Sequence, residues 1–531
     1  MWKKLRFYFA LSRAFAKRDK RKITYSLIFL LLLIFALRIL LPSSLPKLVD
    51  VYREAKKPTF IEGVVGKPIY PNPIFDTTET QKDISKLVFR GLLKTNSEGE
   101  LIADLAKSYV QVGDKEYVFT LRDDVYWHDG YKFTSEDVLY TIKTIQDPAY
   151  QSPLEANFRS VQMEKITDYK IKMKLKESFA PFPYSTTLGI LPAHISLKRY
   201  RPVGTGDFRL KEIGKDKVVL TNEALNLVFK FYENIEDAKF ALKKGEIHAV
   251  GSLSPQEVEA LKNFGGKNLH SAVLHRRLVI VFFNLKDEKL NDELLRKALS
   301  FAVNKEAIKN LAGGTNAMVA TSQLPLKNWV GSQKERYPFN LAQAQQFLLK
   351  AGYKKVEGRA EKDGKQANFT LTSINDPELN SVVNLLKEEW AALGIKINSR
   401  LVNVEELRNN LLPNRNFEIL VNFQEIPADP DQYVLWHTTQ IQNSNITGIS
   451  SPQLDKLLED SRKLADRKQR QGNYKLFTTL LVDSAPAIFL YHPQYTWVVS
   501  NKVSGIDFSE FTVPGDRFSS YRGWRIKKSW F

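Results

Sequence analysis

Apolar and polar residues alternate along short stretches in the first half of the chain. The alternation is clear at residues 117–127 and again at 166–175, and it is typical of strands with one buried face. His128-Asp129-Gly130 consists of turn residues, since Asp bonds its own backbone and Gly accepts positive φ. Thr134 then occupies a helix N-cap position, with Asp137 three residues later as a variant of the capping box. These patterns predict half-buried strands, a tight turn and a helix that begins near residue 135.

A different pattern dominates the second half of the chain. Residues 279–285 are apolar apart from Asn284, as expected for a strand that is buried on both faces. Helices and strands alternate after it. The helices are predicted at 292–311, 341–351, 376–393, from 451 onward and up to about 483, and the strands at 395–397, 417–423 and 487–491. This alternation predicts βα units around a mainly parallel sheet.

A basic segment and a long apolar run open the chain. Residues 23–41 are mostly Leu, Ile and Phe, close to the ~20 residues that a membrane-spanning helix needs. Nine Lys or Arg residues and only one Asp precede this run, and Arg38 near its far end has a side chain long enough to reach the interface. The positive-inside rule therefore predicts a basic cytoplasmic tail (1–22), a single-pass transmembrane anchor (23–41) and an extracytoplasmic remainder.

A cleaved signal peptide is the alternative interpretation of this segment. The apolar run is long for a signal core, and no clear small-x-small cleavage site follows it. Residues 42–58 contain Pro42, Pro46 and Pro58 and predict a short tether behind the anchor.

The length and composition of the chain exclude several classes of protein. At 531 residues, with 43% apolar and 11% aromatic residues, it is long enough for two or three folded domains. Because it contains no cysteine, disulfides, thiolate metal sites, thiol catalysis and a lipid-modified N-terminal cysteine are excluded. Residues 1–41 carry +9 of the net charge of +19, and the rest shows no nucleic-acid-binding motif. A nucleic acid is therefore not expected as a partner.

Motifs of common hydrolases and metal sites are missing from the sequence. The chain has no Gly-x-Ser-x-Gly elbow and no His-Glu-x-x-His helix, and its seven histidines lack the spacing of metal ligands. The loop Gly204-Thr205-Gly206 lacks the Gly-Lys-Ser/Thr ending of a phosphate-binding loop. We therefore predict no catalytic residue, no metal and no cofactor. A hydrolase of envelope material is the least favoured alternative.

Several short motifs occur in the order in which one protein family carries them. They are Asn72-Pro73, Val88-Phe89-Arg90-Gly91-Leu92, Trp127-His128-Asp129-Gly130, Leu191-Pro192-Ala193-His194 and Val203-Gly204-Thr205-Gly206. With these motifs, residues from about 60 to 531 resemble the extracytoplasmic solute-binding proteins that supply ABC importers, specifically the large peptide/nickel (oligopeptide/dipeptide-binding) family 5. Each motif is modest by itself, and their combination is specific.

The resemblance implies an α/β, two-lobed periplasmic-binding-protein-like fold of the class II type, in its large peptide-binding subgroup, here behind an N-terminal transmembrane helix. The first lobe is expected at 59–280 with an inserted subdomain at about 90–190, the second α/β lobe at 281–497, and a return segment that completes the first lobe at 498–531. The resemblance also implies a monomer that captures a peptide or peptide-like small solute by lobe closure and delivers it to the permease subunits of an ABC transporter. A ligand sensor or surface-interaction module with the same fold is the alternative.

The same resemblance implies which stretches contact the ligand. One stretch contains Thr77, Thr78 and Glu79, and the other contains Phe423, Gln424, Glu425 and Asp429. Trp436 and His437 are further candidates for the pocket wall, with packing in the core as the alternative.

One position departs from the pattern of the peptide-binding relatives. These relatives often carry an Asp that neutralises the α-amino group of the ligand, and Ile426 stands at this position here. An unpaired buried ammonium is very costly. We therefore expect either that Glu425 takes the place of that Asp or that the ligand has no free amine there.

Overall fold

The computed structural model describes residue 29 and residues 57–262, 265–324, 329–331, 333–509 and 511–527. Residues 59–531 form one compact unit, and residues 1–58 are assigned to another. Within the described residues, no helix is both long and apolar enough to cross a membrane. The predicted tail (1–22), the anchor (23–41, apart from Phe29) and nearly all of the tether (42–58) lie outside the described residues.

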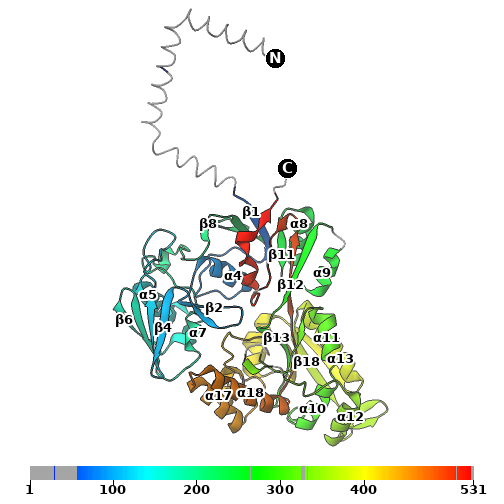
Figure 1. The fold of residues 1–531 in the computed structure, drawn as a ribbon. Helices are drawn as coiled ribbons and strands as arrows, with labels where there is room; N and C mark the ends of the chain where they lie inside the picture. Colours follow the sequence, from blue (N-terminus) through cyan, green and yellow to red (C-terminus); the bar gives the residue numbers. More distant parts are fainter. Residues whose placement is uncertain are drawn as a thin grey trace, which may run out of the picture. The chain divides into compact units, whose positions relative to one another are not determined.

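The first lobe is built on a seven-stranded mixed sheet (Figure 1). In spatial order the strands are β12 (Lys267–Val273), β22 (Gln494–Ser500), β11 (Ala249–Gly251), β1 (Thr59–Val65), β10 (Asn226–Tyr232), β9 (Lys217–Thr221) and β8 (Arg209–Ile213). Strand β1 runs parallel to β10 and β11, and the other pairs are antiparallel. Its helices are α4 (Glu79–Val88), α8 (Ile235–Lys244) and α9 (Pro255–Lys262).

An inserted subdomain extends the first lobe. Its antiparallel sheet has the order β4 (Ala106–Val112), β5 (Glu116–Leu121), β7 (Lys170–Lys174) and β6 (Gln162–Thr167), with helices α5 (Ser135–Gln146), α6 (Glu155–Phe158) and α7 (Phe182–Ser185) beside it. The capping box predicted at the start of α5 is confirmed, because Thr134 accepts from the backbone N–H of Glu136 at 3.3 Å and Asp137 accepts from that of Thr134 at 2.8 Å. A short hairpin of β2 (Leu93–Thr95) and β3 (Leu101–Ala103) leads into this subdomain.

The second lobe is built on a six-stranded sheet. Its order is β14 (Met318–Val319), β21 (Ala487–His492), β13 (Arg277–Phe283), β20 (Ile419–Glu425), β18 (Asn368–Ile374) and β19 (Lys396–Val402). The main helices are α10 (Glu293–Phe301), α11 (Lys305–Ile308), α12 (Leu341–Lys350), α13 (Pro377–Ala391), α17 (Pro452–Lys463) and α18 (Arg467–Asp483), with shorter ones at α14 (Val404–Glu406), α15 (Leu412–Asn414) and α16 (Tyr433–Trp436). Small sheets lie at β15 (Lys354–Val356), β16 (Arg359–Lys362) and β17 (Lys365–Gln366), and at β23 (Val503–Ser504) and β24 (Arg525–Ile526).

The structure corrects two details predicted for the second lobe. The sheet is mixed rather than mainly parallel: β18 is parallel to β19 and β20, whereas β13 is antiparallel to β20 and β21 because it arrives from the first lobe. The helix expected at 292–311 is divided, since α10 ends at Phe301 and the side chain of Asn304 caps the new helix α11 by accepting from the N–H of Ala307 at 3.1 Å.

The chain crosses between the two lobes twice. Strand β12 of the first sheet continues through residues 274–276 into β13 of the second, and β21 returns through Pro493 into β22. A hydrogen bond of 2.8 Å from Leu274 N–H to the Pro493 carbonyl joins the two crossings. Both crossings occur a few residues earlier than the limits expected at 281 and 498. One buried apolar core uses residues between 278 and 491, and the other uses residues between 60 and 274 and from 495 onward, so each lobe has its own core.

Candidate functional site

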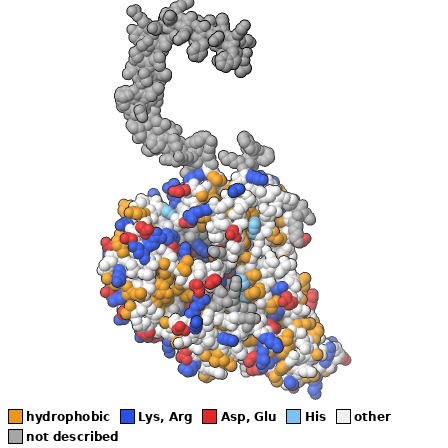
Figure 2. Space-filling model, in the orientation of Figure 1, with side chains coloured by type: hydrophobic (Ala, Val, Ile, Leu, Met, Phe, Trp, Pro, Cys, Tyr) orange, Lys and Arg blue, Asp and Glu red, His pale blue; other side chains and the backbone are white. Residues whose placement is uncertain are grey.

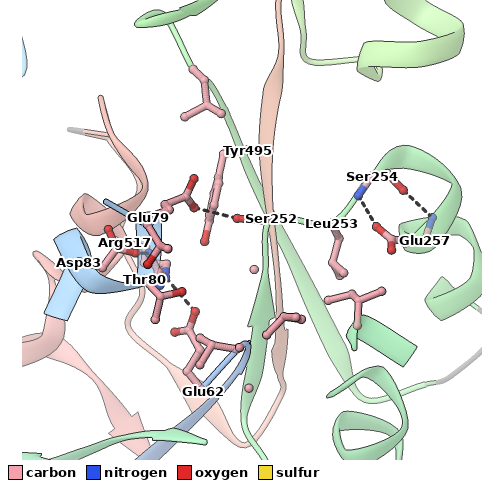
Figure 3. Close-up of a pocket in the computed structure, with 18 of the residues that line it drawn as sticks. Glu62, Glu79, Thr80, Asp83, Ser252, Leu253, Ser254, Glu257, Tyr495 and Arg517 are labelled. Carbon is pink, nitrogen blue, oxygen red and sulfur yellow. Dashed lines mark hydrogen bonds and ion pairs between the residues drawn. The ribbon is translucent and has the colours of Figure 1, made fainter. Parts of the chain in front are cut away.

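A cavity of about 770 Å³ lies between the two lobes (Figure 3). The first lobe lines it with β1, with the first turns of α4 and with the turn between β11 and α9. The second lobe contributes Gly313, the start of α13 and Phe423 of β20. Leu274 and Pro493 of the two crossings belong to the same lining, so the cavity lies beside the crossings.

The start of α4 brings two predicted ligand residues into one capping structure. The Thr78 side chain accepts from the N–H of Gln81 at 3.3 Å, and Gln81 in turn accepts from the N–H groups of Thr78 and Thr77 at 3.0 and 2.9 Å. This capping box satisfies N–H groups that have no partner within the helix. Thr78 and Glu79 line the cavity, whereas Thr77 does not belong to its lining.

Arg277 connects the lobes beside the cavity. It is the first residue of β13, and its guanidinium contacts Glu79 of the first lobe at 3.2 Å and Glu425 of the second at 2.6 Å. The hydroxyl of Ser252 also donates a hydrogen bond of 2.9 Å to Glu79. Figure 3 shows this bond as a dashed line between the two side chains. Glu425 itself lies outside the lining with its side chain 66% exposed, so in this structure it holds Arg277.

A buried ionic cluster forms part of the wall on the first lobe. Arg517, from the C-terminal segment, donates to Glu62 of β1 at 2.9 Å and to Asp83 of α4 at 2.5 Å. Figure 3 shows Asp83 and Arg517 side by side at α4. Burial raises the pKa of Glu62 to about 7 and raises that of Asp83, although Arg517 opposes both shifts.

The opposite wall presents the beginning of α13. Asp376 caps this helix by accepting from the N–H groups of Glu378 and Leu379 at 2.9 and 3.1 Å. Glu378 accepts from the hydroxyl of Tyr491 at 2.8 Å, and burial raises its pKa to about 7. The lobes therefore face each other with carboxyl groups on both sides of the cavity.

The structure places four other predicted site residues outside the cavity lining. Gln424 donates to the carbonyl of its neighbour Glu425 at 2.9 Å. Asp429 is buried and accepts two hydrogen bonds, of 2.7 and 2.6 Å, from Arg470. Trp436 packs between Phe282 and Phe489 in the core of the second lobe. His437 stacks on Tyr433 with ring centroids 4.0 Å apart. For Trp436 and His437, the structure thus favours the alternative of internal packing.

Ile426 is buried and belongs to the core of the second lobe. Its backbone exchanges two hydrogen bonds with Arg276, one from the Ile426 N–H at 2.7 Å and one from Arg276 Nε at 3.0 Å. The position is therefore used to hold a crossing segment in place.

A second contact joins the lobes through the inserted subdomain. Asp431 orients Arg462 by accepting at 2.9 and 2.6 Å, and the guanidinium lies 5.3 Å from the ring centroid of Phe179. The N–H of Ala180 donates to the carbonyl of Arg462 at 2.7 Å. We call the contact of Phe179 and Ala180 with Arg462 the clasp. It joins the inserted subdomain to α17 of the second lobe.

Sequence reasoning missed most of the charged groups of the cavity. The sequence does contain a signal for Glu62, because this residue lies on the same strand face as the buried residues Phe60 and Val64. A charge at a buried strand position needs a partner, so the pattern predicts an ionic contact there. Arg517 has no local signal, since its two carboxylate partners are more than 430 residues away in the chain. Among the described residues, no group of three or more His, Cys, Asp and Glu side chains is arranged to hold a metal ion.

Comparisons with known proteins agree with this architecture. The family model described as bacterial extracellular solute-binding proteins, family 5 Middle, matches residues 100–445. The oligopeptide-binding protein AppA of Bacillus subtilis (strain 168) is 26% identical over 484 residues, which cover 84% of this chain and 88% of AppA. A dipeptide-binding protein of Pseudomonas aeruginosa is 23% identical over 84% of this chain and 92% of its own length.

Two solved structures share the fold. AppA from Bacillus subtilis in complex with a nonapeptide superimposes with a TM-score of 0.71 at 23% identity, over 89% of this chain and 100% of AppA. NikZ from Campylobacter jejuni in complex with Ni(L-His) superimposes with a TM-score of 0.73 at 26% identity, over 88% of this chain and 99% of NikZ. These relatives are named for binding solutes and not for catalysis. Since the family model spans more than half of the chain, from the inserted subdomain into the second lobe, the protein belongs to the bacterial extracellular solute-binding proteins of family 5.

Proposed function

We propose that this protein captures a short peptide or a peptide-like solute in the cavity between its lobes. The observation that carries the proposal is the position of the cavity, which both lobes line beside the two crossings. Its volume of about 770 Å³ lies within the roughly 300–1,000 Å³ typical of small-ligand sites. A solute that touches both walls stabilises the closed arrangement relative to the open one, and this difference drives closure.

The proposal includes delivery to an ABC transporter at the membrane. Residues 23–41 serve as the anchor, with the N-terminus in the cytoplasm and the binding lobes outside. The tether of residues 42–58 spans at most roughly 60 Å when fully extended. An anchored protein of this kind stays within reach of the permease subunits that receive the solute.

Peptide binding and closure test the first part of the proposal. We expect the full-length protein in mild detergent to bind members of a pool of di- to pentapeptides, detected by native mass spectrometry, and to contract in solution scattering when they bind. Phe179→Ala removes the aromatic side of the clasp, worth about 0.5–1 kcal/mol at such sites. It should therefore weaken binding about two- to fivefold in calorimetry.

Phe240→Ala is the matched control, because Phe240 is an exposed ring over Lys244 and lies outside the cavity lining. This variant should bind peptides as the unmodified chain does. Failure of every peptide in the pool to bind, or binding without contraction, contradicts capture by lobe closure. Unchanged affinity of Phe179→Ala contradicts only the role of the clasp.

Topology labelling tests the anchor. Because the chain has no cysteine, a single cysteine introduced by Tyr131→Cys or Lys17→Cys is the only reactive thiol. Tyr131 is 60% exposed, so we expect a membrane-impermeant maleimide to label that variant in intact cells. The Lys17→Cys variant should react only after the cells are permeabilised. The reverse pattern of labelling would overturn the proposed orientation.

A further inference from the structure

Acidic side chains outnumber basic ones on the wall of the cavity, although the whole chain carries a net charge of +19. The six acidic side chains are Glu62, Glu79, Asp83, Glu257, Asp376 and Glu378. The three basic ones are Lys67, Arg277 and Arg517. On the outer face in Figure 2, by contrast, Lys and Arg side chains are spread among Asp and Glu side chains. Solvent-exposed charges more than about 8 Å away are largely screened at physiological ionic strength, so a bound solute responds more to the wall than to the outer surface.

The ionic cluster on the first lobe is not neutral by itself. Arg517 is shared by two carboxyl groups, Glu62 and Asp83, and all three side chains are less than 10% exposed. One oxygen of Glu62, Oε1, accepts from Arg517, whereas the buried oxygen Oε2 has no hydrogen-bond partner among the described residues. A buried carboxylate without a full set of partners is costly unless a cation or a proton joins it. The cluster, which belongs to the cavity wall, therefore holds two carboxyl groups for one guanidinium.

The second lobe contributes acidic groups from the opposite side. Glu378 receives its hydrogen bond from Tyr491, a neutral phenol, and Asp376 stands two residues before it. Glu79 of the first lobe shares its cationic partner Arg277 with Glu425. A positively charged group in the cavity thus meets carboxyl groups from both lobes, and attraction to both favours closure.

We infer that the cavity selects solutes with a net positive charge, in particular short peptides that carry lysine or arginine. This inference rests on the proposed function of the cavity and adds the charge class of its solute. An ammonium or guanidinium group in the cavity is attracted to the acidic side chains that line both lobes. An acidic side chain in the same place adds a like charge beside the wall, which is unfavourable.

Binding of a cation should also release protons. Burial raises the pKa values of Glu62 and Glu378 to about 7, so both are partly protonated near neutral pH. Glu62 is influenced by Arg517, Asp83 and Glu79, and Glu378 by Tyr491, Asp376 and Arg277. A cation favours the ionised form of each carboxyl group and lowers its pKa. The affinity for cationic peptides should therefore increase as the pH rises from about 6 to 8.

The test compares three tripeptides on the full-length protein in mild detergent. At pH 7.5, calorimetry should give an affinity for Ala-Lys-Ala about tenfold higher than for Ala-Met-Ala, with Ala-Glu-Ala the weakest. In Glu62→Gln and in Glu378→Gln, this tenfold preference for Ala-Lys-Ala over Ala-Met-Ala should fall below threefold. Titrations in phosphate and in Tris should show proton release with Ala-Lys-Ala and none with Ala-Met-Ala.

The control is Glu223→Gln, because Glu223 is exposed and outside the cavity lining. It should leave all three affinities unchanged. Equal affinities for the three peptides would overturn the charge inference. So would an equal loss of affinity for Ala-Lys-Ala and Ala-Met-Ala in both cavity variants. Neither result contradicts peptide capture itself. Absence of binding by all three overturns this inference, and the proposed function falls with it only if every peptide in the wider pool also fails to bind. Thermal melting verifies folding, and Glu378→Gln decides the test if Glu62→Gln does not fold.

Discussion

Replacing Arg517 with methionine should lower the free energy of unfolding by about 3–5 kcal/mol. The substitution removes the hydrogen bonds to Glu62 and Asp83 but keeps an apolar side chain of similar length against Phe518. Two carboxyl groups then remain buried without a cation, and the cost of such unpaired charges exceeds that of losing an exposed ion pair several times over. Denaturant unfolding followed by circular dichroism measures the loss.

The loss should depend on pH in one direction. Without Arg517 the pKa of Glu62, which burial already raises to about 7, rises further, so both carboxyl groups are neutral in mild acid. A neutral carboxyl group needs no cation. The free energy of unfolding that Arg517→Met loses relative to the unmodified chain therefore shrinks as the pH falls from 8 to 5. Arg522→Met is the matched control, because its ion pair with Asp207 has side chains 74% and 53% exposed and should contribute less than about 1 kcal/mol. A deficit that is the same at pH 5 and pH 8 would contradict the role assigned to the buried charges.

Replacing Asp429 with alanine should destabilise the fold by a similar amount, about 3–5 kcal/mol. The change leaves the guanidinium of Arg470 buried, since both side chains of this pair are only 4% exposed. Arg470 keeps its hydrogen bonds to the Ser461 carbonyl and to Tyr474, at 3.1 and 3.3 Å. Because Asp429 lies outside the cavity lining, the folded variant should bind peptide within about twofold of the unmodified chain.

This second variant separates two roles for the same residue. A ligand contact loses affinity at unchanged stability, whereas a structural ion pair loses stability at unchanged affinity. Chemical unfolding and calorimetry on the same preparation measure both quantities. Asp123→Ala is the control, since Asp123 pairs with Lys107 on the surface and its loss should leave the stability nearly unchanged. If Asp429→Ala lost affinity for peptide at unchanged stability, Asp429 would be a ligand contact after all.

Local signals in the sequence predicted local structure well. The capping box at Thr134 and the buried strand near 279 both appear in the structure, because caps and strand faces depend on residues a few positions apart. The family resemblance, carried by short ordered motifs, is confirmed by the family model over residues 100–445. The two-lobed fold followed from that resemblance and could not be obtained from periodicity alone.

The charged wall of the cavity could not be predicted in the same way. Asp429 and Glu425 look alike in the sequence, yet one is paired inside the second lobe and the other is exposed beside Arg277. What separates them is the position of arginines that come from distant strands and helices. Glu378 likewise gains its environment from Tyr491, 113 residues further along the chain. Pairings over such separations depend on the completed tertiary structure.

The two crossings impose an order on the biogenesis of the protein. The second lobe is one continuous segment of chain, whereas the first lobe is completed by β22, which lies between β11 and β12. At about 5–20 residues per second, on the order of 10–45 s of translation separates β12 from β22. A growing chain therefore finishes its second lobe first, while β12 still lacks its only neighbour in the described sheet. An unpaired strand edge of this kind is a template for pairing with another chain, and β22 covers the edge of β12 that faces it in the finished sheet.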